Sequence, residues 1–240
     1  MVLLEIKKSF HNKSFLYLFG MTAVAFIMGW ILPVGIDKVA ELHYSDYLFS
    51  TYTVFTQFGM LFFCFGTAFF FNREYSQKTI LFYRSFGYNS TSFLLTKLLI
   101  MVIEEFVALT VCLFVSQLVF GESGFSAVSL LLFFTVVLQY FLITGIFSMI
   151  FSNMLLVVGC SIMYWLATII LVSFGGAFKN FAVFDASNDF YNVIDQYYAG
   201  KALSFTGAEI NPAIIEIAAL FAAALLVSLL SRKRWLKMGI

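Results

Sequence analysis

Long apolar stretches separated by short polar connections dominate the chain. Crossing about 30 Å of hydrocarbon takes roughly 20 residues of helix, because a helix satisfies its own backbone groups. Six stretches are long enough, running approximately from Ser14 to Ile36, Leu48 to Phe71, Phe93 to Phe120, Ala127 to Phe151, Leu155 to Phe174 and Pro212 to Leu230. The pattern therefore predicts an all-α polytopic membrane protein with six transmembrane helices.

The segments outside these spans have features of their own. Residues 1–13 place Leu3, Ile6 and Phe10 at helical spacing, which predicts either an interfacial helix or a simple basic anchor. Residues 175–211 are too long for a turn and rich in Phe and Tyr, which predicts short helices at the outer leaflet or an interfacial aromatic cap. Asn211 followed by Pro212 supplies an N-cap residue and a first-turn proline, which predicts that the last helix starts there. No repeat or linker divides residues 1–240, so we expect a single transmembrane domain.

Composition agrees with a lipid environment. Hydrophobic residues make up 62% of the chain and charged residues only 11%, which excludes a soluble globule. Cys64, Cys112 and Cys160 each lie inside an apolar run without metal-ligand spacing, so neither a disulfide framework nor a metal site is expected.

The distribution of Lys and Arg predicts the orientation. With both termini in the cytoplasm, eleven of the 14 basic residues fall on the inner side: Lys7, Lys8, Lys13, Arg73, Lys78, Arg84, Lys97, Arg232, Lys233, Arg234 and Lys237. Only Lys38, Lys179 and Lys201 fall outside. We therefore predict a multi-pass protein of the cell membrane with cytoplasmic termini.

Residues 72–92, between the second and third spans, mix charge with apolar side chains. Ile80 and Tyr83 recur at helical spacing, which predicts a short amphipathic helix along the cytoplasmic membrane face, and the Gly87-Tyr88-Asn89-Ser90 segment ends it. An ordinary interfacial loop anchored by aromatic and basic residues is the alternative.

Within this segment the order of Glu74, Thr79-Ile80 and then Lys97-Leu98 resembles the coupling region of type-2 ABC transporter permeases. The sequence departs from that pattern at Lys78, where Gly is common, and at Phe86-Gly87, where Pro is common. The resemblance also covers the six spans and the longer outer segment. It implies a short cytoplasmic coupling helix between spans two and three.

The resemblance further implies partners. Family members pair as two six-span subunits with two ABC ATPase subunits, so we expect a homodimer or a pair of similar permeases in the bilayer and no nucleic-acid partner. The chain contains no G-x-x-x-x-G-K-[ST] motif, so ATP and Mg would be bound by the partner and not by this chain. The residues expected to couple to the ATPase are Glu74, Tyr75, Lys78, Thr79, Ile80, Tyr83 and Arg84, with Ile80 and Tyr83 as its anchors.

Glu104 and Glu105 lie near the middle of the third span, where an ionised carboxylate is costly. They are candidates for the translocation path or a dimer contact, or else for acids bonded to a hydroxyl group of another helix. The pair also resembles the start of CAAX-type intramembrane proteases, but the two histidines, His11 and His43, lie outside the spans. The enzyme reading therefore lacks its metal and base ligands, and no catalytic residue is expected. Glu216 is expected to reach outer water.

These observations favour the permease subunit of an ABC exporter that moves a hydrophobic or amphipathic peptide. The alternative is a membrane immunity or scaffold protein that needs no ATPase.

Overall fold

A computed structural model describes residues 2–36, 38–39, 41–122, 126–186, 188–201 and 205–232, and Lys233, Arg234 and Lys237 lie outside these residues. All regular secondary structure within these ranges is helical. The elements are α1 (Val2–His11), α2 (Ser14–Ile31) with a π-helical continuation (Leu32–Ile36), α3 (Tyr44–Ser76), α4 (Ile80–Ser85), α5 (Ser90–Phe120), α6 (Ala127–Ile150), α7 (Met154–Ser173), a 3-10 helix (Gly176–Phe181), α8 (Asp189–Tyr198) and α9 (Gly207–Leu230). Six of these helices are long and apolar enough to cross a membrane, which confirms the predicted fold class.

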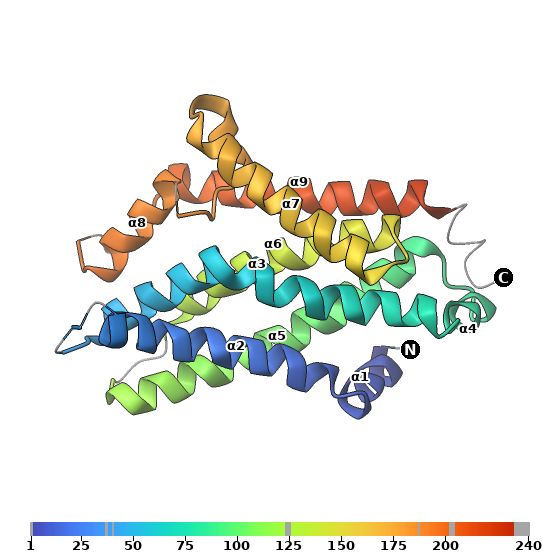
Figure 1. The fold of residues 1–240 in the computed structure, drawn as a ribbon, viewed down its shortest axis with the longest axis horizontal. Helices are drawn as coiled ribbons and strands as arrows, with labels where there is room; N and C mark the ends of the chain where they lie inside the picture. Colours follow the sequence, from blue (N-terminus) through green and yellow to red (C-terminus); the bar gives the residue numbers. More distant parts are fainter. Residues whose placement is uncertain are drawn as a thin grey trace.

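The long helices run along the molecule's long axis with α6 near the centre (Figure 1). In its most apolar window 67% of α6 is buried, against 28% in each of α2, α7 and α9. Aromatic rings of α2, α3 and α6 fill the space between these helices, as in the contacts of Phe55 with Phe26 and Phe133. Gly59 of α3 allows the Tyr140 ring of α6 to approach, since a Cβ there would lie 2.6 Å from it.

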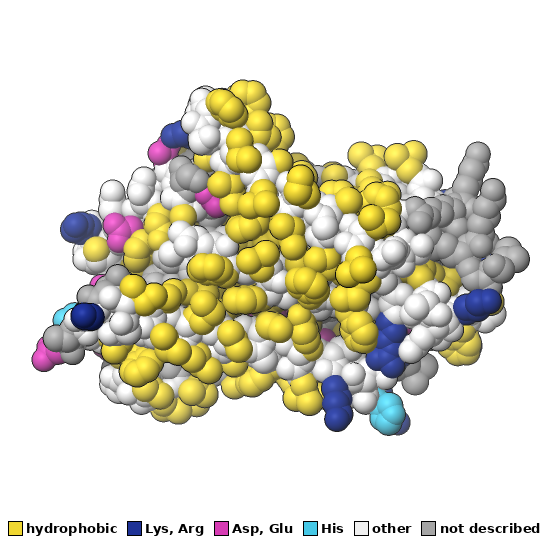
Figure 2. Space-filling model, in the orientation of Figure 1, with side chains coloured by type: hydrophobic (Ala, Val, Ile, Leu, Met, Phe, Trp, Pro, Cys, Tyr) yellow, Lys and Arg dark blue, Asp and Glu magenta, His cyan; other side chains and the backbone are white. Residues whose placement is uncertain are grey.

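α3 and α5 are longer than a bilayer requires. At 1.5 Å per residue, the 33 residues of α3 extend about 50 Å. Their linked ends lie with α1 and α4 at one end of the bundle (Figure 1). On the face drawn in Figure 2, Lys and Arg side chains lie toward both ends, and Asp and Glu lie mainly toward the end away from α1 and α4.

The last helix begins earlier than the sequence indicates. α9 starts at Gly207, and Pro212 lies inside it, so the expected start at Asn211-Pro212 is wrong. The backbone N–H of Thr206 donates to the Glu209 carboxylate at 2.7 Å, which caps the helix before the proline is reached.

The outer segment covers Glu216 instead of leaving it in water. This carboxylate is 7% exposed. It accepts hydrogen bonds from Gln139 Nε2 at 2.6 Å and from the Val183 backbone N–H at 3.0 Å. The expectation that Glu216 reaches outer water is therefore wrong, because the chain around Val183 folds back onto α6 and α9.

Candidate coupling site

The residues that carry the sequence pattern meet at the inner ends of α3 and α5. Lys97, in the second turn of α5, directs its ammonium group to Glu74 Oε1 at 2.8 Å. Thr79, just before α4, donates its hydroxyl hydrogen to the other oxygen of Glu74. The pattern of Glu, Thr and Lys thus corresponds to one set of contacts that fixes the turn between α3 and α4.

Helix α1 completes this site with two residues that the sequence did not single out for it. Glu5 Oε2 lies 2.7 Å from Lys97 Nζ, and Lys8 Nζ lies 2.6 Å from Glu74 Oε1. Tyr83 of α4 donates its hydroxyl hydrogen to Glu5. A signal was available: Glu5 and Lys8 are three residues apart, and residues at this spacing share a helix face. We call Glu5, Lys8, Glu74 and Lys97 the charge cluster.

The charge cluster contains two carboxylates and two ammonium groups, and all of its side chains except that of Lys8 are shielded from solvent. The Lys97 side chain is 1% exposed and that of Glu74 is 3% exposed. The Lys97 ammonium also lies 4.4 Å from the centre of the Phe70 ring. Desolvated charges persist only when paired and hydrogen-bonded, and here each carboxylate has both kinds of partner.

Tyr83 supports this arrangement as a neutral group. Burial, followed by its hydrogen bond to Glu5, raises the pKa of Tyr83 above its usual range. The phenol therefore stays protonated at physiological pH, and its O–H group donates a hydrogen bond to the Glu5 carboxylate.

The departure at Lys78 has a conformational explanation. Lys78 adopts φ of 56°, in the left-handed region that glycine enters without steric cost. A positive φ here explains why Gly suits this position. Gly87, at the other end of α4, has φ of 77° and turns the chain back toward α5. With Lys78, the turn before α4 therefore has a backbone conformation that glycine also adopts readily.

The two expected anchors face the interior of the subunit. Ile80 is 0% exposed and Tyr83 is 2% exposed, because both side chains lie on the inward face of α4. The exposed apolar side chains here are Leu81 and Phe82 of α4 and Phe86 directly after it, and we call these three the outward face of α4. The anchor assignment to Ile80 and Tyr83 is therefore corrected: these residues hold α4 to its own subunit, and only the outward face is available to another protein.

The remaining residues of the expected coupling set lie around α4. Lys78 is exposed, whereas Tyr75 and Arg84 are half-buried. The Tyr75 hydroxyl donates toward Met149 Sδ of α6 at 3.7 Å. Tyr75 therefore connects the coupling segment to the central helix, while Lys78 adds a cation to the exposed surface.

Glu104 and Glu105 lie inside the subunit, at 3% and 0% exposure. Glu105 accepts a hydrogen bond from Thr22 Oγ1 of α2 at 2.8 Å, as expected for an acid bonded to a hydroxyl group of another helix. Neither side chain lies on the surface of the single subunit, and a dimer contact through them stays a prediction. A role in translocation stays a prediction. The described residues contain no group of His, Cys, Asp and Glu that could hold a metal ion.

Comparison with known proteins gives a match over almost the whole chain. The model of the peptide export permease protein YydJ family matches residues 2–240. The probable peptide export permease protein YydJ of Bacillus subtilis (strain 168) is 37% identical over 238 residues, which cover 99% of each chain. No solved structure matches.

Proposed function

The chain belongs to the peptide export permease protein YydJ family, and from this premise we propose that it is the permease subunit of an ATP-driven ABC exporter of a hydrophobic or amphipathic peptide. It is a multi-pass protein of the cell membrane. Two ABC ATPase subunits bind ATP and Mg on behalf of two copies of this chain. The sequence supports a separate ATPase, because it holds no phosphate-binding loop of the Walker type.

The observation that carries the proposal is the charge cluster beneath α4. Lys97 and Glu74 join α5 to α3, and Glu5 joins both to α1 and, through Tyr83, to α4. A push on the outward face of α4 is therefore passed to three helices at once, two of which span the membrane. Such a rigid linkage is what a subunit needs if it is moved by a partner.

The outward face of α4 has the composition of a protein contact. Phe82 and Phe86 are each 57% exposed and Leu81 is 42% exposed, and the two Phe rings lie 4.6 Å apart. Aromatic side chains commonly supply most of the binding energy of an interface. We infer that these three residues, with Lys78 beside them, enter a groove of the ATPase.

The proposed orientation places both termini and α4 in the cytoplasm. It rests on the excess of Lys and Arg in the segments that this orientation places on the cytoplasmic side. The second subunit has room on α2, α7 and α9, which bury the least of their apolar windows within one copy. A homodimer would cover part of this surface.

The test replaces both Leu81 and Phe82 by Ala and measures how much of the ATPase co-purifies with the chain. Loss of two anchors at about 1 to 4 kcal/mol each should weaken association at least tenfold and stop peptide export. Phe10→Ala is the matched control, because Phe10 is 56% exposed at the same end of the bundle but lies on α1.

Membrane insertion should be unchanged in both variants, because neither site lies in a span. Full ATPase association by the Leu81→Ala, Phe82→Ala variant would refute the coupling assignment. If the unaltered chain brings down no ATPase while the cells still export or resist the peptide, a scaffold or immunity role replaces the exporter.

A further inference from the structure

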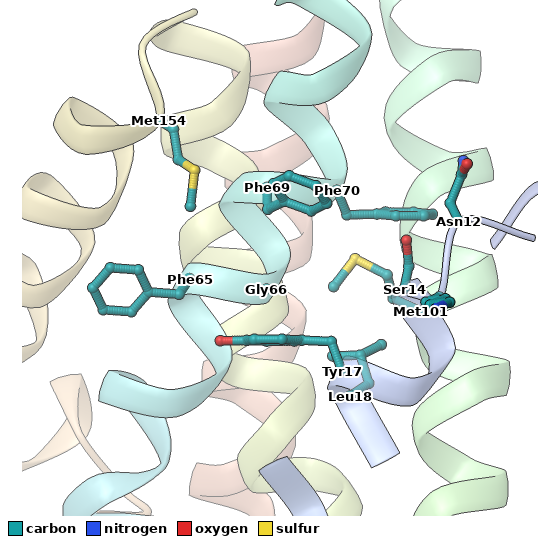
Figure 3. A pocket seen from close by; sticks show the side chains of 11 residues that line it. Asn12, Ser14, Tyr17, Leu18, Phe65, Gly66, Phe69, Phe70, Met101 and Met154 are labelled. Carbon is teal, nitrogen blue, oxygen red and sulfur yellow. The ribbon is translucent and has the colours of Figure 1, made fainter. Parts of the chain in front are cut away.

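An apolar cavity of about 360 Å³ opens at the side of the bundle near the start of α2 (Figure 3). Its apolar walls are Tyr17, Leu18, Phe65, Phe69, Phe70 and Met101, and the first residue of α7, Met154, closes one side. Tyr17, Phe65 and Phe69 are between 36% and 46% exposed. The cavity therefore opens sideways from the bundle, where hydrocarbon surrounds a membrane protein.

A second cavity of about 530 Å³ adjoins the first and shares Phe69 and Met154 with it. Its other lining residues are polar or basic: Asn72, Arg73, Ser76, Gln77 and Ser152. Along α3 the residues Phe65, Phe69, Arg73 and Ser76 follow one another at about one turn each, so Phe65 and Arg73 are about 12 Å apart along the helix axis. Together the two cavities form a groove that is apolar at one end and polar at the other.

Two cations line this groove without acidic partners among the described residues. Arg73 donates to Asn12 Oδ1 at 3.0 Å and lies 5.9 Å from the Phe69 ring centre, and both contacts are neutral. Lys13 lines the apolar cavity and forms no ion pair within that part of the chain. By contrast, Lys8 and Lys97 are both paired with Glu74. The described residues that line the two cavities include no carboxylate.

We propose that this groove binds one anionic phospholipid of the cytoplasmic leaflet, with its phosphate at Arg73 and Lys13 and an acyl chain in the apolar cavity. The proposal rests on the orientation given above, which puts both cations at the level of the inner headgroups. Basic sites between helices on that side suit anionic headgroups. The groove is apolar at one end and cationic at the other. A phospholipid has the same arrangement, with apolar acyl chains at one end and a charged headgroup at the other.

A lipid fits these observations better than the exported peptide or a second copy of the chain. A bound peptide would need hydrogen-bond partners for its own backbone, and the larger part of the apolar cavity offers aromatic and aliphatic side chains. A second copy would have to bring an acidic side chain, and the carboxylates of α1 and of the inner end of α3, Glu5 and Glu74, are already paired within their own subunit. A phospholipid supplies both an apolar acyl chain and an anionic phosphate, and it is present at high concentration in the bilayer.

The test uses the purified full chain, delipidated in a neutral detergent, without any ATPase. Phosphatidylglycerol and phosphatidylcholine with identical acyl chains are titrated in, and binding is followed by native mass spectrometry. The unaltered chain should prefer phosphatidylglycerol. Arg73→Gln and Lys13→Gln should each weaken phosphatidylglycerol binding about fivefold, and together about 25-fold, with phosphatidylcholine binding unchanged. Lys7→Gln and Lys78→Gln are the matched controls, because they remove exposed cations that line neither cavity.

A second arm separates the lipid from a soluble anion. Met154→Trp narrows both cavities without changing charge, and it should weaken the long-chain lipid while leaving any binding of glycerol phosphate as it was. Equal affinity for glycerol phosphate and phosphatidylglycerol would overturn the proposal, and so would a double Gln variant that keeps the lipid preference. If the double variant changes subunit association instead, a second copy fills the groove and the lipid assignment is wrong. Since no transport is measured, these results are independent of the exporter function.

Discussion

Replacing Lys97 by Met removes the central cation of the charge cluster while keeping a side chain of similar length. Glu74 would retain Lys8 at 2.6 Å and the Thr79 hydroxyl group, and Glu5 would retain Tyr83 and a longer contact to Lys8 of 3.9 Å. The buried site would change from net zero charge to one excess negative charge. Breaking a buried pair typically costs 3 to 5 kcal/mol. Because each carboxylate keeps two of its partners, we expect the lower end, about 3 kcal/mol, or roughly 150-fold in the docking equilibrium.

The loss should be concentrated in the docking of α1, which Lys97 joins through Glu5. Ser9 of α1 is 1% exposed and supplies a local probe. In a chain whose three natural cysteines have been replaced, Ser9→Cys should react slowly with a thiol reagent, and the additional Lys97→Met change should accelerate labelling roughly 100-fold. The faster reaction follows because the thiol reacts only when α1 is undocked.

Two control variants show whether the effect belongs to the buried pair. Lys7→Met removes an exposed cation from the same helix and should leave labelling unchanged. Lys8→Met should have a small effect, since its side chain is 31% exposed and partly exposed pairs contribute about 0 to 1 kcal/mol. Equal labelling rates for the Lys97→Met and Lys7→Met variants would refute the argument that Lys97 holds α1 in place.

Three further predictions concern other parts of the chain. Lys78→Gly should raise the unfolding temperature slightly, because φ of 56° suits glycine, whereas Lys78→Val should lower it by the strain of a β-branched residue; equal unfolding temperatures would contradict this. Glu216→Leu should lower the free energy of unfolding by about 2 to 4 kcal/mol in a denaturation assay, because it leaves Gln139 and a backbone N–H unpaired. Glu216→Gln should lower it less, and the reverse order would exclude these hydrogen bonds as the cause. On intact cells an impermeant thiol reagent should label Ser45→Cys but not Ser76→Cys, and labelling of the latter would invert the proposed orientation.

The spans and the coupling motif could be predicted from the sequence because each depends on local pattern. Hydrophobic length alone predicts α6, whose observed bounds are within a residue of those expected. The start of α9 was misplaced because a strong local signal, Asn211-Pro212, competed with the Thr206 and Glu209 cap five residues earlier.

The contacts of the coupling segment depend on pairs far apart in the chain. Glu5 and Lys97 are separated by 92 residues, and nothing in either local sequence states that they meet. The inward direction of Ile80 and Tyr83 was likewise undecided, because a six-residue helix with apolar residues on both faces has no single hydrophobic side. The contacts of Tyr83 with Glu5 of α1 and with Phe93 of α5 determine which face remains exposed.

The pairing of Glu5 with Lys97 also has a consequence for biosynthesis. α1 leaves the ribosome before α5, yet its carboxylate, Glu5, has no buried cation to pair with until the third membrane helix has been made. Until then α1 lacks the ion pair to Lys97 that joins it to α5. We therefore expect α1 to reach its final position only after α5 is in place, so that a failure to insert α5 would also leave α1 undocked.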